Sequence, residues 1–226
     1  MTTSGTTAFN MDLVELAEEA GERAGYEIRS GYELRTARRS LNLMFSEWAN
    51  AGINLWTVEQ GEVPLVAGTA VYSLPTDTVD LLDHTIRQTT GASQTDITIT
   101  RISVSTYASI PNMLSQSRPL QVYINRLAPI PTITVWPIPS DGSYTFVYWR
   151  LRRIQDAGNG VNTMDVPFRF LPAMVAGLAY FLAVKNPSSF DRIPMLKQMY
   201  DDAWSLAAAE DSDRSAIRFV PRVARI

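Results

Sequence analysis

The residues best suited to chemistry gather in one acidic segment around the single histidine, His84. Asp77, Asp80 and Asp83 precede it at intervals of three residues. Such a cluster is compatible with a metal site, but it lacks the alternating oxygen ligands and the central glycine of a calcium-binding loop. In a strand, this spacing also places Asp80 and Asp83 on opposite faces. We therefore expect turn-capping or solvated aspartates here, and no metal site.

Residues for nucleophilic or acid-base catalysis are scarce. The sequence has no cysteine, so a thiol nucleophile is excluded, and a Ser-His-Asp triad would require His84. No glycine-rich phosphate-binding motif occurs. A glycosidase needs two placed carboxylates, for which Glu47, Glu59 and Glu62 are candidates, but any globular chain of this size offers such acids. We predict that the protein is not an enzyme and binds no cofactor, with a cell-wall-degrading glycosidase as the alternative.

Aromatic and basic residues are interleaved in the segment 148–153, Tyr-Trp-Arg-Leu-Arg-Arg. Such a strip can stack on bases and contact phosphates, so a nucleic-acid-binding module is a second alternative. In a strand, Arg150 and Arg152 would share a face with Tyr148. The net charge of −3 does not favour non-specific nucleic-acid binding. We favour a strand that ends in an exposed charged turn.

The residues discussed above must be positioned by secondary structure. Apolar residues recur at helical spacing near both ends of the chain, which predicts helices there. Apolar residues at spacings of three and four predict helices over about 10–25 and 32–49. The first is predicted to be capped by Asn10 and to end at Gly25, and the second to end at Gly52. The apolar run 170–184 predicts a buried helix, because a membrane span needs about 18 residues or more. A last helix is predicted to begin at Pro194. Its predicted inner face consists of Leu196, Met199, Ala203 and Leu206.

Between the helical ends, the hydrophobic period changes to two from about residue 58, which indicates strands. The runs 132–138 and 143–151 flank Pro-Ser-Asp-Gly and are predicted to form a hairpin. A short helical turn is expected near 103–110. The predicted fold class is α+β: a helical bundle formed by the N- and C-terminal segments, with an inserted antiparallel β domain, either a sandwich or a barrel.

The C-terminal segment 214–226 has four arginines and no acid, and Pro221 forbids a regular helix there. One interpretation is a disordered tail. Disordered tails are usually poor in large apolar residues, however, so the other is an extended arm that docks into a groove on a neighbouring protein. The arm residues are Arg214, Ile217, Arg218, Phe219, Val220, Pro221, Arg222, Val223, Arg225 and Ile226.

Arginine outnumbers lysine 18 to 2. This bias suits paired contacts across interfaces, although a GC-rich genome explains it equally well. Candidate subunit-interface residues lie on the first two predicted helices, where a solvated face is an equally good interpretation. They are Glu15, Glu18 and Glu22 on the first helix, and Arg35, Arg38 and Arg39 on the second. The N-terminus lacks the basic start of a secretory signal, so none is predicted.

Several motifs, in a shared order, resemble the head-to-tail adaptor proteins of short-tailed phages. The resemblance covers residues 10–210, and its hallmark is the helix and exit segment 41–56, Leu-Asn-Leu-Met-Phe-Ser-Glu-Trp-Ala-Asn-Ala-Gly-Ile-Asn-Leu-Trp. The other motifs are Val71-Tyr-Ser-Leu-Pro75, Val79-Asp-Leu-Leu-Asp83, Arg118-Pro119, Trp136-Pro-Ile-Pro139, Tyr148-Trp-Arg-Leu-Arg152 and Asp165-Val-Pro-Phe-Arg-Phe-Leu-Pro172. The strand region of about a hundred residues departs from the compact, mostly helical adaptors and is similar to the longer ones.

The resemblance implies a structural virion protein of the phage neck, made in the cytoplasm of a bacterial host. Such adaptors form a ring of their own copies, commonly twelve, beneath the portal protein. The ring extends the DNA channel, through which packaged DNA passes without specific binding, and it offers a platform for tail nozzle or tail fibre proteins. No membrane is involved. The C-terminal extension of such adaptors grips the portal, and the arm 214–226 corresponds to it in position.

The predicted organisation has a flexible N-terminal arm over 1–9 and a helical bundle domain from 10–57 plus 165–213. The inserted β domain spans 58–164, and the extended arm follows at 214–226.

Overall fold

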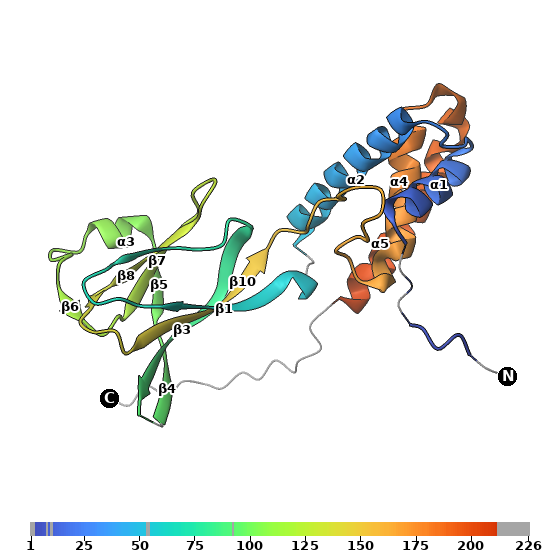
Figure 1. The fold of residues 1–226 in the computed structure, drawn as a ribbon. Coiled ribbons are helices and arrows are strands. Elements are labelled where there is room, and N and C mark those ends of the chain that lie inside the picture. The colour runs from blue at the N-terminus through green and yellow to red at the C-terminus, as the bar shows by residue number, and fades with distance from the viewer. Residues whose placement is uncertain (1–2, 8, 10, 53–54, 92, 212–226) are drawn as a thin grey trace, which may run out of the picture. The chain divides into compact units, whose positions relative to one another are not determined.

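The structure of the protein is a computed structural model. The residues that it describes are 3–7, 9, 11–52, 55–91 and 93–211. The chain forms two compact units, drawn in Figure 1: a helical unit, Met1–Trp56 with Gln155–Ile226, and a β unit, Thr57–Ile154. The second boundary between the units therefore falls ten residues before the predicted position at 164.

Helix α1, Leu13–Ala24, begins and ends with local hydrogen-bonding motifs. The Asp12 carboxylate accepts from the Glu15 backbone N–H at 2.8 Å, and the Glu15 carboxylate accepts from the Asp12 N–H at 3.2 Å. This reciprocal capping box satisfies two N–H groups at the helix start. The cap is therefore Asp12 and not the predicted Asn10, which lies outside the described residues. Gly25 ends the helix as predicted, in the left-handed conformation with φ 92°.

Helix α2, Gly31–Ala51, is capped in the same way by Ser30 and Glu33. Gly52 ends it with φ 75°, as the sequence predicted. Its buried face is regular at helical spacing, because those side chains pack into the bundle. The buried residues are Ala37, Ser40, Leu41, Met44, Phe45 and Trp48.

Helix α4, Leu171–Ala183, is the central helix of the bundle and packs against α1, α2 and α5, Ile193–Glu210. Gly177 permits the close approach of its neighbours, since a Cβ there would lie 2.5 Å from the Met44 sulfur and 2.8 Å from the Tyr200 ring. Across this contact, the Trp48 indole N–H donates to the Tyr200 hydroxyl at 2.8 Å. The predicted buried helix is thus confirmed. Short 3-10 turns lie at Leu55–Thr57, Phe168–Phe170 and Pro187–Arg192.

The buried face of α5 differs from the prediction. Leu196 is buried, but Met199 and Leu206 are 42% and 72% exposed. An aromatic contact decides the rotation of the helix, since the centroid of the Trp204 ring lies 4.7 Å from that of Trp48. These large side chains take the inner positions, so the stripe of Met199 and Leu206 faces outward.

In the β unit, one sheet has the strand order β1-β10-β3-β4, and all its pairs are antiparallel. Its strands are β1, Val58–Pro64; β3, Thr78–Thr90; β4, Ser93–Thr98; and β10, Tyr144–Arg152. β10 lies between β1 and β3, with Phe146 opposite Val63 and Ile86. Its alternating side chains therefore supply the core on one face.

The second sheet has the order β2-β8-β7-β5, in which β5 runs parallel to β7. Its strands are β2, Val71–Ser73; β5, Thr100–Ile102; β7, Gln121–Asn125; and β8, Thr132–Trp136. A small parallel pair joins β6, Gln116–Ser117, to β9, Ile138–Pro139. The predicted helical turn is confirmed as α3, Val104–Ala108.

The predicted hairpin of 132–138 with 143–151 is wrong. β8 pairs with β2 and β7, whereas β10 pairs with β1 and β3. The two runs lie in different sheets because each buries its apolar face against the other sheet, as Ile133 and Phe146 do in one common core. The α+β class and the sandwich are confirmed, and the described strands do not close into a barrel.

Candidate functional site

The predicted portal-binding arm, 214–226, lies outside the described residues. The chain that leads to it is fixed at Asp211, which follows α5 and has a fully buried side chain. Its carboxylate accepts a hydrogen bond from the Leu55 N–H at 3.0 Å and forms an ion pair with Arg169. This contact joins the end of α5 to the exit of α2, so the departure point of the C-terminal segment is set by buried structure.

The three candidate arginines of α2 lie together on its surface. Arg35, Arg38 and Arg39 line a hollow of about 290 Å³ with Tyr32. Arg35 donates to the Gly31 carbonyl at 3.2 Å, and Arg38 donates to the Gly158 carbonyl at 3.3 Å. Within the described part of the chain, none of the three forms an ion pair with an acid. Their positive charge is therefore not neutralised there.

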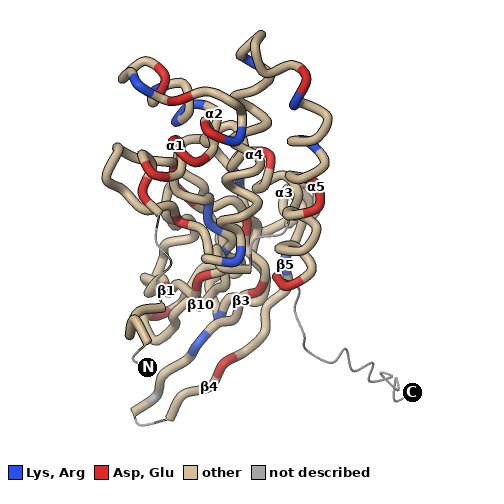
Figure 2. The backbone as a smooth tube through the Cα atoms, turned by 90° about the vertical axis from the view of Figure 1, so that its right-hand side faces the viewer, with Lys and Arg blue, Asp and Glu red and all other residues tan. Residues whose placement is uncertain are grey.

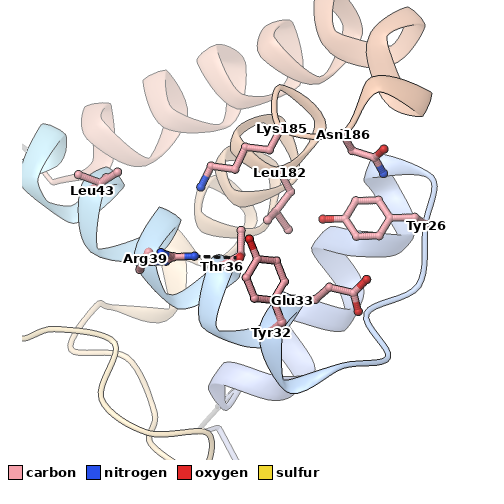
Figure 3. A pocket seen from close by; sticks show the side chains of 9 residues that line it. All are labelled: Tyr26, Tyr32, Glu33, Thr36, Arg39, Leu43, Leu182, Lys185 and Asn186. Carbon is pink, nitrogen blue, oxygen red and sulfur yellow. Dashed lines mark hydrogen bonds between the residues drawn. The ribbon is translucent and has the colours of Figure 1, made fainter.

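A larger groove of about 680 Å³ lies next to this hollow, between α2 and the end of α4 (Figure 3). Its cations are Arg39 and Lys185, and its apolar surface includes Leu43 and Leu182. The sequence pattern did not indicate Lys185 as a site residue. The only available signal was a lysine directly after a buried apolar helix, which does not indicate a groove. The residues that line it are Tyr26, Tyr32, Glu33, Thr36, Arg39, Leu43, Leu182, Lys185 and Asn186.

The candidate acids of α1 have two different roles. Glu15 belongs to the capping box of the helix. Glu18 and Glu22 are exposed, and in the described residues neither makes a hydrogen bond or an ion pair. Figure 2 marks the acidic and basic residues along the backbone. The structure therefore leaves exposed acids on α1 and exposed bases on α2 and after α4.

The aromatic and basic strip of β10 is used inside the β unit. Arg150 donates to Asp77 at 2.5 Å and to Glu59 at 2.8 Å, and Arg152 donates to Glu59 at 2.7 Å. The hydrogen bond from Arg150 lowers the pKa of the Asp77 carboxyl. These ion pairs join β10 to β1 and to the start of β3. They explain the two arginines structurally, and nothing in them favours the nucleic-acid alternative.

The acidic segment around His84 does not form a metal cluster. Asp77 is paired as above, and Asp80 forms ion pairs with Arg101 and Arg126. No described group of three or more histidine and acidic side chains is placed to hold a metal ion. His84 is buried and stacks on Phe146, with ring centroids 5.9 Å apart.

The candidate glycosidase acids of the β unit are likewise in ion pairs. Glu59 pairs with Arg150 and Arg152, and Glu62 pairs with Arg87 at 2.6 Å. Glu47 lies on the exposed surface of α2. Of the described helices, none is both long and apolar enough to cross a membrane.

Comparison with known proteins adds one match. The model of the family described as SU10 adaptor protein matches residues 11–224, which is nearly the whole chain and includes most of the C-terminal segment. A comparison with curated proteins gave no match.

Proposed function

Because this chain belongs to the SU10 adaptor protein family, a family of phage head-to-tail adaptor proteins, we propose that its copies form a ring that docks beneath the portal. The ring extends the DNA channel and offers a platform for tail nozzle or tail fibre proteins. The protein then acts as a non-enzymatic part of the virion neck. The observation that carries this proposal is the family match over residues 11–224.

Two arrangements of residues support a role in assembly. The segment 214–226 begins three residues after the buried Asp211, and its apolar residues and arginines suit a groove with acids on the portal. The charges of α1 at Glu15, Glu18 and Glu22 and those of α2 at Arg35, Arg38 and Arg39 are our candidates for contacts between neighbouring copies; all are exposed except the half-buried Arg38. A contact repeated around a ring strengthens every other contact, since later ones form within one assembly.

The arm is tested by deletion. We expect that a chain without residues 214–226 folds but no longer binds purified portal rings, as measured by co-sedimentation and electron microscopy. A matched control replaces only Arg214, Arg218, Arg222 and Arg225 by glutamine. It should retain part of the binding, because the apolar residues remain. Undiminished binding by the deleted chain would refute the arm, and no binding by the full chain would refute the adaptor role itself.

A further inference from the structure

Two cations in the groove between α2 and α4 lie close together without an acid to neutralise them. The proximity of Arg39 lowers the pKa of Lys185, in addition to the larger effect of burial. Neither residue forms an ion pair within the described part of the chain. Like charges held near each other in a partly desolvated groove favour the binding of an anion.

The two cations are also held in place. Lys185 donates to the hydroxyl of the fully buried Ser40 at 2.7 Å, and Ser40 donates to the Thr36 carbonyl at 3.0 Å. Arg39 donates to the Thr36 hydroxyl at 3.2 Å, as the dashed line in Figure 3 shows. One turn of α2 therefore positions both groups before any ligand arrives, which lowers the entropic cost of binding.

The acid that lines the groove, Glu33, has another task. Its carboxylate accepts hydrogen bonds from the backbone N–H groups of Arg29 and Ser30 at 2.8 and 2.9 Å. These bonds lower the pKa of Glu33 and hold it at the start of α2. It forms no ion pair with Arg39 or Lys185, so the groove keeps two cations available.

The complementary charge is present on α1. Glu18 and Glu22 lie four residues apart, one turn along the helix, and both are exposed without a partner in the described structure. Glu19, between them, is paired with Arg23 at 2.8 Å. No ion pair connects α1 to Arg39 or Lys185 within one chain. The chain thus carries an acidic edge, formed by Glu18 and Glu22, and a basic groove with Arg39 and Lys185. The two surfaces form no ion pair with each other in the described structure.

We propose that the groove at Arg39 and Lys185 receives Glu18 and Glu22 of a second copy of this chain. The proposal rests on the ring of the proposed function, and it names the surfaces that meet there. If each contact joins one edge to one groove, it is heterologous, and such contacts generate rings when the rotation closes. Tyr32 and Leu43, which are 67% and 58% exposed beside the cations, supply apolar area to the same contact.

Thiol cross-linking tests this pairing directly, because the natural chain has no cysteine. A chain with Glu19→Cys and Val184→Cys keeps all four charges of the proposed contact, because these partly exposed positions only adjoin Glu18 and Lys185. It is mixed with portal rings and treated with a short bis-maleimide, and we expect a ladder of covalent oligomers on a denaturing gel. The matched control combines Glu19→Cys with Lys197→Cys, an exposed position on α5, and should give monomers. A ladder from the control pair but not from the test pair would overturn the proposal. The proposal would also be overturned if neither pair gave a ladder on portal-bound chains.

Reversal of the charges gives a second test. If these residues only stabilised the fold of one chain, mixing two charge-reversed variants would not restore assembly. One variant carries Arg39→Glu and Lys185→Glu, and the other carries Glu18→Arg and Glu22→Arg. Each alone should self-associate on portal rings at least about tenfold more weakly than the natural chain. An equal mixture should recover assembly, because each variant then meets the opposite charge on both sides. Failure of the mixture to recover, with both variants folded by circular dichroism, would refute the pairing.

The two proposals fail in different ways. Binding of single chains to the portal through the arm is measured in the same samples by native mass spectrometry. If the natural chain does not bind the portal, the adaptor role fails. If all variants bind the portal but charge reversal leaves the contact between copies unchanged, only the pairing of edge and groove fails.

Discussion

In the β unit, five arginines are neutralised by acids of the same unit, whereas Arg35, Arg38 and Arg39 on α2 are not. Arg87 pairs with Glu62 and Asp96, Arg101 and Arg126 share Asp80, and Arg150 and Arg152 share Glu59. In the described structure, Arg35, Arg38 and Arg39 donate hydrogen bonds only to carbonyl or hydroxyl oxygens. Of the remaining β-unit arginines, Arg118 and Arg153 have no acidic partner in the described structure.

The difference shows two uses of the same residue type. In the β unit, ion pairs join strands that are distant in sequence, as Arg150 of β10 joins β1 through Glu59. On the helical unit, uncompensated charge on exposed helix surface costs little in water and remains available to another molecule. In the helical unit, the ion pair of Arg169 with Asp211 has a fully buried carboxylate, and Asp211 directly follows α5.

Loss of that buried pair should have the largest effect on stability. Asp211→Ala leaves Arg169 without its acid and the Leu55 N–H without an acceptor, and we expect a loss of about 3 kcal/mol in the free energy of unfolding. Urea denaturation measures the loss, and hydrogen exchange should locate it in the helical unit. The control Asp202→Ala, at an exposed site on α5, should change stability by less than about 0.5 kcal/mol. Equal effects of the two changes would contradict the importance of burial.

The network of the β unit should rank second. The Arg150 side chain is 11% exposed, so Arg150→Met leaves Asp77 with less compensation in a partly desolvated place and should cost about 2 kcal/mol. Thermal unfolding followed by hydrogen exchange of the β-unit peptides measures this. Arg126→Met is the matched control, since that side chain is 58% exposed and its loss should cost less than about 1 kcal/mol. A smaller effect at Arg150 than at Arg126 would refute the structural role of the network.

Unlike the paired arginines and acids of the β unit, His84 is a buried titratable residue whose ring nitrogens have no hydrogen-bond partner in the described structure. Burial lowers its pKa, Arg101 contributes in the same direction, and Asp83 opposes both. The unfolded chain therefore binds a proton more readily than the folded one, and the stability of the β unit should fall as the pH drops below about 6.5. His84→Phe should remove this slope and add about 1 kcal/mol, because neither ring nitrogen has a hydrogen-bond partner in the described structure.

The measurement for His84 is urea denaturation at several pH values between neutral and acidic. Thr85→Val is a matched control, since the Thr85 hydroxyl is also buried without a partner and its loss leaves the histidine in place. That variant should keep the full pH slope. An unchanged slope in His84→Phe would show that another group titrates.

The smallest effect on folding is expected in the groove. Arg39→Ala with Lys185→Ala should change the free energy of unfolding by less than about 0.5 kcal/mol. The change breaks no described ion pair, and it relieves a repulsion between two like charges. Chemical denaturation of the isolated chain checks this. A large loss would mean that these cations stabilise the fold, and it would remove the contrast between the two units.

Local chemistry made part of the fold predictable from the sequence. Gly25 and Gly52 end their helices because a glycine adopts positive φ without steric cost, and this depends only on the residue itself. The apolar run 170–184 could be recognised as a buried helix because its apolar composition is a property of the segment itself. The predicted face of α5 was partly wrong because Met199 and Trp204 compete for the inside, and only the position of Trp48 decides between them.

Some residues of the candidate site could likewise be predicted from the sequence, and others could not. Charge composition pointed to Arg39 and Glu18, since exposed charges interrupt the apolar stripe of a helix at readable positions. Lys185 could not be found in this way, because its place beside Arg39 depends on how α4 crosses α2 at Gly177. The arm 214–226 remains a prediction from its residues alone.

The sequence by itself determined the element types, the glycine ends of α1 and α2 and the α+β class, because glycines and hydrophobic period act over a few neighbouring residues. The start of α1 was misplaced, since its cap is Asp12 and not Asn10. Tertiary structure alone decided which strands pair and which charges meet. The runs 132–138 and 143–151 read as a hairpin, yet each buries its apolar face on the other sheet. Likewise, the structure neutralises Arg150 and leaves Arg39 unpaired, since an arginine finds an acid only where the packed chain places one within reach.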